Sequence, residues 1–256
     1  MKRRLWTRDE MILVLNLYMK LPFSKIHDYN PEVIKMADLL DRSPASVAMR
    51  LGNYASCDPL LAERNVRGLA DGRRRCMPYW EEFQDNQEDL IYESECIRAK
   101  YEGNTIEHKY QNVLEKLEFV EGKDRERWVK MRVNQSVFRE MVLNNYSCRC
   151  ALTDIDLPEL LVASHIIPWS VNVRERLNPA NGICLSTLYD AAFDKGLITF
   201  NPETTELIVS ERLKDRAKKE FYEKYFGSLE GRKLNTAEKY RPSAECLNYH
   251  LRRVFH

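Results

Sequence analysis

The chain has 256 residues, of which 44% are hydrophobic and 31% charged, with a formal net charge of +1. This composition is typical of a globular protein and excludes an intrinsically disordered chain. No apolar run approaches the roughly 20 residues that a membrane helix needs, so we expect no membrane partner. An odd number of cysteines without a secretion signal predicts reduced thiols and a cytoplasmic location.

Charge is unevenly distributed along the chain. Positive charge is in excess over residues 1–80 and 129–256, and negative charge over 81–128. Both ends are therefore candidates for contact with a polyanion, although excesses this small also occur in proteins that never bind nucleic acid. The length and the pattern predict a helical module over 1–85, a helical connector over 86–128 and a mixed domain over 129–256.

Three helices are predicted near the N-terminus. Thr7 and Glu10 have the spacing of a capping box ahead of an apolar run. Asn30 and Ser43 can each cap a helix, and each precedes a proline, which suits the first helical position. A tight turn separates the second and third helices, which is typical of a helix-turn-helix; a plain helical bundle is the alternative.

The third helix is the candidate reader of DNA. Its apolar residues fall on one face, so we expect Ser46, Arg50 and Asn53 to be exposed. Arg50 and Asn53 suit guanine and adenine edges respectively. An arginine-rich stretch follows, which we expect to form a loop that either holds phosphates or is simply solvated. Its arginines are Arg64, Arg67, Arg73, Arg74 and Arg75, of which the last three are the predicted DNA contacts.

The second half of the chain mixes helices with short strands. A helix is predicted from Arg132, and the alternation in "ELLVASHIIPW" then predicts a strand that carries His165. The Asn181–Gly182 pair favours a positive-φ turn ahead of a second short strand, "ICLS".

A further helix, "TLYDAAFDK", follows the second strand directly. We expect Thr187 to cap it and Gly196 to end it. A hairpin around "NPETT", a charged helix from about Glu211 and a short final helix complete the pattern. The predicted class is therefore α+β.

One stretch, Ala163 to Leu197, offers the groups that phosphodiester hydrolysis needs: a base, a cation site and a group that orients the base. His165 has a near-neutral intrinsic pKa and can act as the base. Asn181 can hydrogen-bond across the loop and orient either the imidazole or the loop that carries it. Asp190 and Asp194 are spaced i, i+4, so both can reach one divalent cation such as Mg²⁺.

Each of these residues also has a simpler structural interpretation. A lone histidine on a strand is more often a satisfied core residue, and an asparagine before glycine is most often a turn former. Paired aspartates on a helix are usually solvated. The combination within one stretch favours the chemical interpretation.

Three blocks of this stretch, "ASHIIPW", "LNPANGICL" and "YDAAFDKGLITF", resemble the HNH endonuclease family, in the branch associated with predicted restriction endonucleases. The similarity covers about Arg132 to Phe255. The N-terminal "WTRDEMILVLNLYMKLPF" is similar, less specifically, to a module that accompanies such nucleases. The resemblance implies a ββα-metal fold with His165 as general base, Asn181 as the middle residue of the motif and Asp190 as a metal ligand.

Two positions depart from the family pattern. The third residue of the motif is usually histidine, and here Tyr189 and Asp190 stand in its place, which favours Mg²⁺ or Mn²⁺ over Zn²⁺. The residue before the base is often a metal ligand, and here it is Ser164. Asp194 then either completes the metal site or braces the turn that follows.

Cysteines near the motif give no reason to expect a structural zinc. Cys148, Cys150 and Cys184 lack the paired C-x-x-C spacing of a four-cysteine site. We expect Cys150 and Cys184 to pack beside the two strands instead.

Residues and resemblance together predict a metal-dependent DNA endonuclease, either restriction or modification-dependent, that acts on double-stranded DNA. The predicted attack of water gives 5′-phosphate and 3′-hydroxyl ends, and cutting of both strands suits a homodimer or sequential nicking. One alternative is a DNA-binding protein with an inactive HNH fold, marked by Ser164 and the missing third histidine. The retention of His165, Asn181 and Asp190 argues against it. Another is an enzyme acting on RNA or nucleotides, which the lack of an aromatic and basic platform disfavours.

Overall fold

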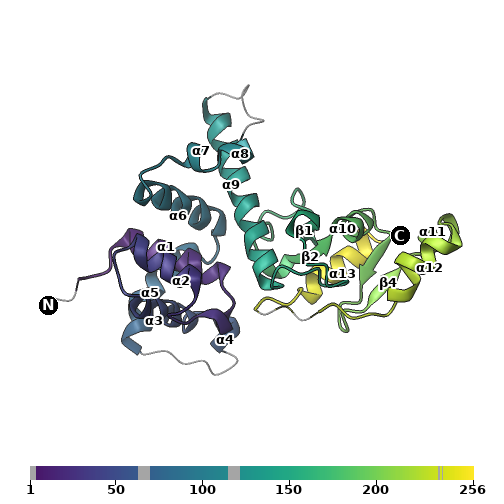
Figure 1. Cartoon of the computed structure of the whole chain (residues 1–256), viewed down its shortest axis with the longest axis horizontal. Helices are drawn as coiled ribbons and strands as arrows, with labels where there is room; N and C mark the ends of the chain where they lie inside the picture. The colour runs from purple at the N-terminus through teal and green to yellow at the C-terminus, as the bar shows by residue number, and fades with distance from the viewer. Residues whose placement is uncertain (1–3, 63–69, 115–121, 236, 238) are drawn as a thin grey trace. The chain divides into compact units, whose positions relative to one another are not determined.

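The computed structural model describes residues 4–62, 70–114, 122–235, 237 and 239–256 (Figure 1). The chain forms two compact units, residues 1–137 and 138–256. The described part of the first contains helices and no strand, whereas the second combines helices with two antiparallel strand pairs, so the protein is α+β. Within the described ranges, none of the helices combines the length and apolar character of a membrane span. The boundaries expected at residues 85 and 128 stay a prediction.

A buried central helix organises the first unit. All residues of α1 from Met11 to Tyr18 are buried, and α3, α5 and α6 pack around this helix. This run is apolar except for Asn16, and a helix buried on every side is stable only when other elements surround it. The helices of the unit are α1 (Arg8–Lys20), η1 (Phe23–Lys25), α2 (Pro31–Leu39), α3 (Pro44–Ala55), α4 (Pro59–Ala62), α5 (Ala70–Phe83), α6 (Gln87–Tyr101), α7 (Ile106–Lys109), α8 (Gln111–Leu114) and the start of α9 (Gly122–Asn145).

The predicted helix starts are confirmed. Thr7 and Glu10 form a capping box, in which each side chain bonds the backbone N–H of the other residue. The side chains of Asn30 and Ser43 cap α2 and α3. Asp41, with φ of 50°, makes the tight turn between these helices.

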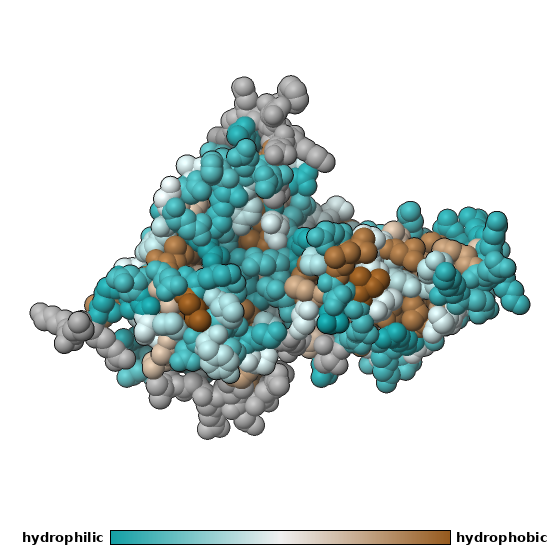
Figure 2. Space-filling model, viewed as in Figure 1, coloured by the Kyte–Doolittle hydropathy of each residue, from teal (hydrophilic) through white to brown (hydrophobic). Residues whose placement is uncertain are grey.

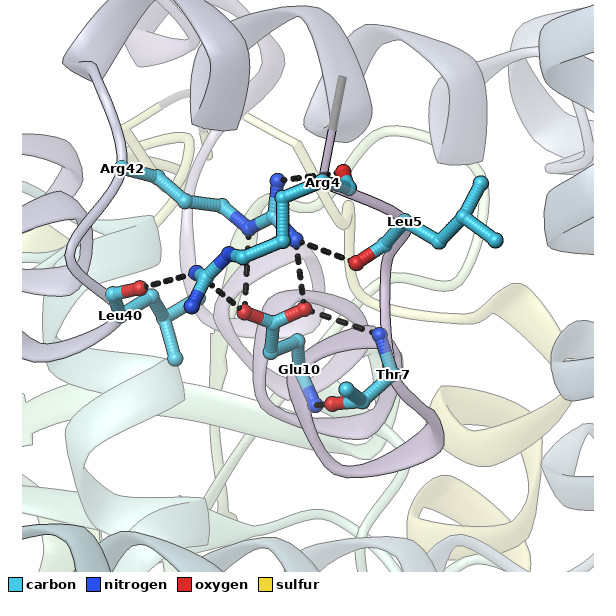
Figure 3. Close-up of polar contacts among 6 residues, drawn as sticks. All are labelled: Arg4, Leu5, Thr7, Glu10, Leu40 and Arg42. Atoms are coloured by element: carbon cyan, nitrogen blue, oxygen red, sulfur yellow. Dashed lines mark hydrogen bonds and ion pairs between the residues drawn. The ribbon is translucent and has the colours of Figure 1, made fainter. Parts of the chain in front are cut away.

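Glu10 also anchors the chain that precedes α1 (Figure 3). Its carboxylate accepts hydrogen bonds from Arg42 at 2.7 and 3.0 Å and from Arg4 at 2.7 Å. Arg42 also donates to the carbonyl of Leu5 at 2.8 Å. Burial opposes ionisation of Glu10, but hydrogen bonds from Arg42 and from the Thr7 N–H outweigh it and hold the pKa of Glu10 below its usual value. The network fixes the N-terminal segment to the turn between α2 and α3.

The described part of the second unit contains a strand–strand–helix arrangement followed by a hairpin, three α-helices and a short 3₁₀ helix. β1 pairs antiparallel with β2, and β3 with β4. Figure 1 shows α10 beside β1 and β2, which it contacts. The elements are the end of α9, η3 (Pro158–Leu160), β1 (Leu161–His165), η4 (Pro179–Asn181), β2 (Gly182–Ser186), α10 (Thr187–Asp194), β3 (Ile198–Phe200), β4 (Leu207–Val209), α11 (Glu211–Arg216), α12 (Lys219–Tyr225), η5 (Gly227–Leu229) and α13 (Ala244–Arg253).

Two details of this unit differ from the prediction. The N-cap of α10 is Ser186 rather than Thr187, because β2 runs directly into the helix. The charged helix expected from Glu211 is divided into α11 and α12, because Ala217 is extended, with ψ of 143°. Gly196 does end α10, with φ of 64°, as predicted.

In the view of Figure 2, hydrophilic residues cover most of the visible surface, as expected when apolar side chains fill the cores.

His250 of α13 fixes the C-terminal end of α10. It is 1% exposed and stacks on Phe193, with ring centroids 3.6 Å apart. Its Nε2–H donates to the Phe193 carbonyl at 3.1 Å, and its Nδ1 accepts from the Thr199 hydroxyl at 2.9 Å. Burial lowers the pKa of His250 to about 4, so the ring is neutral at pH 7. Because Asp194 follows Phe193, these contacts hold the helix end that carries this carboxylate.

Candidate active site

His165, the last residue of β1, lies opposite Gly182, the first residue of β2, at the end of the strand pair next to the connecting loop. The positive φ expected near Gly182 is wrong, because its φ is −129°. Glycine is needed there for close packing instead: a Cβ atom would lie 2.5 Å from Val142 Cγ2 and 2.9 Å from Phe138 Cζ. Its absence lets α9 pack directly against the strands beside His165.

Two aromatic rings and a carbonyl group hold the imidazole of His165. The ring stacks on Phe138 with centroids 3.9 Å apart and contacts Trp169 edge-on at 5.5 Å. Its Nε2 lies 2.9 Å from the carbonyl oxygen of Arg176. A carbonyl only accepts, so Nε2 carries the proton and the lone pair of the neutral ring is on Nδ1. Burial lowers the pKa of His165, and the Arg176 carbonyl and the charge of Asp190 offset this only in part.

Asn181 orients the loop rather than the imidazole itself. Its side chain is fully buried: Oδ1 accepts from the Ile167 N–H at 2.7 Å, and Nδ2 donates to the carbonyls of Ile167 at 3.1 Å and Glu175 at 3.0 Å. The backbone N–H of Ile166 donates to the Asn181 carbonyl at 2.9 Å. Asn181 therefore ties both ends of the loop that follows β1 to the start of β2.

Asp190 and Asp194 lie one turn apart on α10, and Asp190 is near His165. Burial raises the pKa of Asp190, while the Ser164 hydroxyl and His165 oppose the rise. The pKa of Asp194 is raised by desolvation and then by the negative charge of Asp190. Each carboxylate is therefore less stable as an anion here than in water, which a nearby cation would reverse.

Ser164 places a buried hydroxyl beside the first aspartate. The residue is 2% exposed, and its hydroxyl lies close enough to Asp190 to lower the pKa of that carboxyl. By normal hydrogen-bond geometry, however, Oγ has no partner in the described part of the chain. A buried hydroxyl without a partner is unusual and leaves this oxygen available at the aspartate site.

Residues 150–201 match the family model described as HNH endonuclease. This segment is an HNH domain. It contains β1, β2 and α10 together with His165, Asn181 and both aspartates. Comparison of the chain with curated proteins gave no match.

The HNH domain presents a donor set that fits a hard divalent cation. HNH nucleases use such a metal. Mg²⁺ binds through one or two carboxylates and keeps several waters, which suits Asp190 and Asp194 with the unpartnered Ser164 Oγ nearby. Among the residues that the structure describes, no group of three or more histidine, cysteine or acidic side chains is arranged to hold a metal. The two carboxylates alone would therefore have to supply the acidic ligands.

The cysteines of the HNH domain are packed as predicted. Cys150 and Cys184 are fully buried, and the backbone N–H of Ser186 in β2 donates to Cys150 Sγ at 3.3 Å. Cys148, just before this domain, is half-buried and has φ of 53°. These thiols therefore belong to the packing around the strands.

The expected exposure of Arg50 and Asn53 on α3 is wrong. Arg50 is 7% and Asn53 8% exposed, whereas Ser46 is half-buried. Arg50 donates to Cys76 Sγ at 3.8 Å, and a Cβ on Gly72 would lie 2.1 Å from Asn53 Oδ1. Cys76 and Gly72 belong to α5, which thus covers the face of α3 that was expected to read DNA bases.

Arg73, Arg74 and Arg75 are exposed, but on a helix. The loop predicted for them is wrong, because α5 begins at Ala70 and includes all three. Arg64 and Arg67 lie outside the described residues. The accessible arginines of this region therefore belong to α5 rather than to α3.

Sequence reasoning missed three residues around the imidazole: Phe138, Trp169 and Arg176. Phe138 lies on α9 and meets His165 only through the fold. Trp169 is the last residue of the block "ASHIIPW", and Arg176 lies between this block and the next, so their nearness in sequence to His165 was a usable signal.

Proposed function

We propose that the chain is a metal-dependent DNA endonuclease with His165 Nδ1 as its general base. The observation that carries the proposal is the Nε2–Arg176 hydrogen bond of 2.9 Å, which assigns the lone pair to Nδ1 in a ring near Asp190. The lowered pKa of His165 keeps the imidazole neutral near pH 7. A neutral imidazole can accept a proton from water at that pH.

The proton moves from the attacking water to Nδ1 as the oxygen–phosphorus bond forms. The imidazolium is then stabilised by the charge of Asp190 and by its Nε2–H bond to the Arg176 carbonyl. A divalent cation held by Asp190 and Asp194 would supply positive charge for the phosphate and the departing 3′ oxygen. Asn181 holds the loop that carries the Arg176 carbonyl, through its hydrogen bond to the neighbouring Glu175 carbonyl. The bond between phosphorus and the 3′ oxygen breaks as the new bond forms, and the departing 3′ oxygen takes a proton from solvent water, so the products are a 5′-phosphate and a 3′-hydroxyl.

DNA contacts outside the HNH domain are assigned to α5. Arg73, Arg74 and Arg75 are exposed, so each is available to bind a phosphate without base specificity. The role is that of a restriction or modification-dependent enzyme on double-stranded DNA, acting as a homodimer or by sequential nicking.

A plasmid assay tests this function. Wild-type protein is incubated with unmethylated and cytosine-modified plasmids in Mg²⁺, Mn²⁺ or EDTA, and the ends are identified by ligation and by phosphatase treatment. Metal-dependent cutting supports the nuclease, and the preferred plasmid decides between a restriction and a modification-dependent role. DNA binding without cutting in either metal would instead support an inactive HNH fold, the alternative that Ser164 at an expected ligand position favours.

A further inference from the structure

The loop that follows β1 returns to His165 at Arg176. Its carbonyl oxygen accepts the Nε2–H of His165 at 2.9 Å. Its side chain points back along the loop: Nε donates to the Trp169 carbonyl at 2.7 Å, and the guanidinium carbon lies 5.3 Å from the Trp169 ring centroid. The backbone and the side chain of Arg176 thus bind two different neighbours.

Trp169 contacts both Arg176 and the imidazole of His165. Its indole meets the imidazole at 87° with centroids 5.5 Å apart, while Phe138 is stacked on the imidazole at 13°. Rotation of the imidazole about its Cβ–Cγ bond would break the Arg176 hydrogen bond and the stacking on Phe138 together. The orientation of the base therefore depends on the placement of Arg176 and Trp169.

We propose that Arg176 and Trp169 are positioning residues that hold His165 with Nε2 on the carbonyl and Nδ1 toward the reacting water. This inference rests on the proposed function. The Arg176 side chain donates a hydrogen bond to the Trp169 carbonyl, and this contact fixes the position of the Arg176 carbonyl. The Trp169 ring limits the tilt of the imidazole. A general base that is misplaced by about 1 Å can lose as much as about 100-fold in rate.

An arginine beside a nuclease site is also a natural phosphate ligand, and the geometry favours positioning over that role. Arg176 is half-buried and its Nε–H is directed at a backbone carbonyl within the loop. Arg174, two residues earlier, is exposed. Arg174→Ala removes the same charge from the same loop and is the matched control.

The kinetic test separates the rate at saturating DNA from DNA affinity. For Arg176→Ala and Trp169→Ala we expect kcat to fall about tenfold or more, with the DNA dissociation constant in Ca²⁺ unchanged within about twofold. Arg176→Lys and Trp169→Phe keep a cation and an aromatic edge and should recover part of kcat. Arg174→Ala should leave kcat unchanged. Weaker DNA binding by Arg176→Ala with wild-type kcat would overturn the proposal in favour of a phosphate contact.

A spectroscopic test does not require activity. In the full chain labelled with ¹⁵N-histidine, two-bond ¹H–¹⁵N correlations distinguish the protonated from the unprotonated ring nitrogen, and His165→Ala identifies the signals of His165. Wild type and Arg174→Ala should show the Nε2–H form, whereas Arg176→Ala and Trp169→Ala should show a mixture of both neutral forms. An unchanged Nε2–H form in both alanine variants would overturn the proposal. Should either alanine variant lose its fold by circular dichroism, Arg176→Gln or Trp169→Leu, which also remove the guanidinium or the aromatic ring, replaces it under the same criterion.

The two tests also separate this inference from the proposed nuclease. Absence of cutting by wild type refutes the nuclease, while the tautomer of His165 in the variants still decides whether Arg176 and Trp169 orient the ring. Cutting by wild type with no tautomer change in the variants keeps the nuclease and refutes the positioning role.

Discussion

Asn181 and His165 bind neighbouring carbonyl groups of one loop. Asn181 Nδ2 donates to the carbonyl of Glu175 at 3.0 Å, and His165 Nε2 donates to that of Arg176 at 2.9 Å. The middle residue of the motif therefore acts on the base through the backbone of the loop. This relationship explains why a fully buried amide belongs to a site whose chemistry it does not touch.

Asn181→Asp should destabilise the second unit. The new carboxylate would face the carbonyls of Ile167 and Glu175, which Nδ2 now satisfies, in a fully buried position. We expect the free energy of unfolding in urea to fall by about 3 kcal/mol or more at pH 7. Asn172→Asp is the matched control, because Asn172 Oδ1 only accepts, from the Arg174 N–H, and should change stability by less than about 0.5 kcal/mol. Equal effects of both substitutions would contradict the role of Asn181.

Gly182→Ala should lower both stability and cleavage. The added methyl would meet Val142 at 2.5 Å and Phe138 at 2.9 Å, and Phe138 is the ring on which His165 stacks. We expect a loss of about 1–3 kcal/mol in thermal or urea unfolding and a lower rate of cleavage. Gly52→Ala on α3 has no atom within 4 Å of the new Cβ and should stabilise by up to about 1 kcal/mol. A Gly182→Ala protein as stable and active as wild type would show that α9 can move away.

Asp190→Asn and Asp194→Asn should weaken metal binding. Each removes one anionic oxygen ligand, so we expect Mn²⁺ affinity, measured by calorimetry without DNA, to fall at least about tenfold for Asp190→Asn. Asp194→Asn should raise the metal concentration needed for half-maximal cleavage. Glu203→Gln alters an exposed carboxylate elsewhere in the second unit and should change neither quantity. Wild-type Mn²⁺ affinity in both aspartate variants would refute this pair as the metal ligands.

Cleavage should decrease on the acid side of neutrality. The folded-state pKa of His165 lies below its usual 6.5, so the neutral base persists at pH 7 and is lost as the pH falls through the lower, folded value. Bound metal opposes the raised pKa of Asp190, so saturating metal leaves His165 as the group whose titration the rate follows. With saturating metal, the single-turnover rate should therefore be flat above about pH 7 and fall with a midpoint below 6.5. A midpoint above 6.5, with DNA binding unchanged, would contradict a neutral buried base.

Local signals in the sequence were sufficient for much of the fold. The caps at Thr7, Asn30 and Ser43 depend on residues within one helical turn, and the structure contains each of them. The same holds for the order of β1, β2 and α10, because alternation and the Gly196 end signal are also local.

Burial that depends on a distant partner could not be predicted in this way. Arg50 and Asn53 have the spacing of an exposed helix face, yet α5 covers them, and nothing within α3 records that contact. Gly182 was predicted as a turn residue, whereas its lack of a side chain serves the approach of α9. Phe138 stacks on His165 from 27 positions earlier in the chain. Each of these needs a contact between elements, which periodicity does not encode.

The central claim, that His165 is the general base of a nuclease, is tested most directly by single-turnover plasmid cleavage in Mg²⁺ or Mn²⁺. We predict that His165→Ala lowers the rate at least about 100-fold with unchanged DNA affinity. Added imidazole should restore part of the rate to His165→Gly. Cleavage by His165→Ala at the wild-type rate, or no cleavage by the wild-type protein in either metal, would contradict the account.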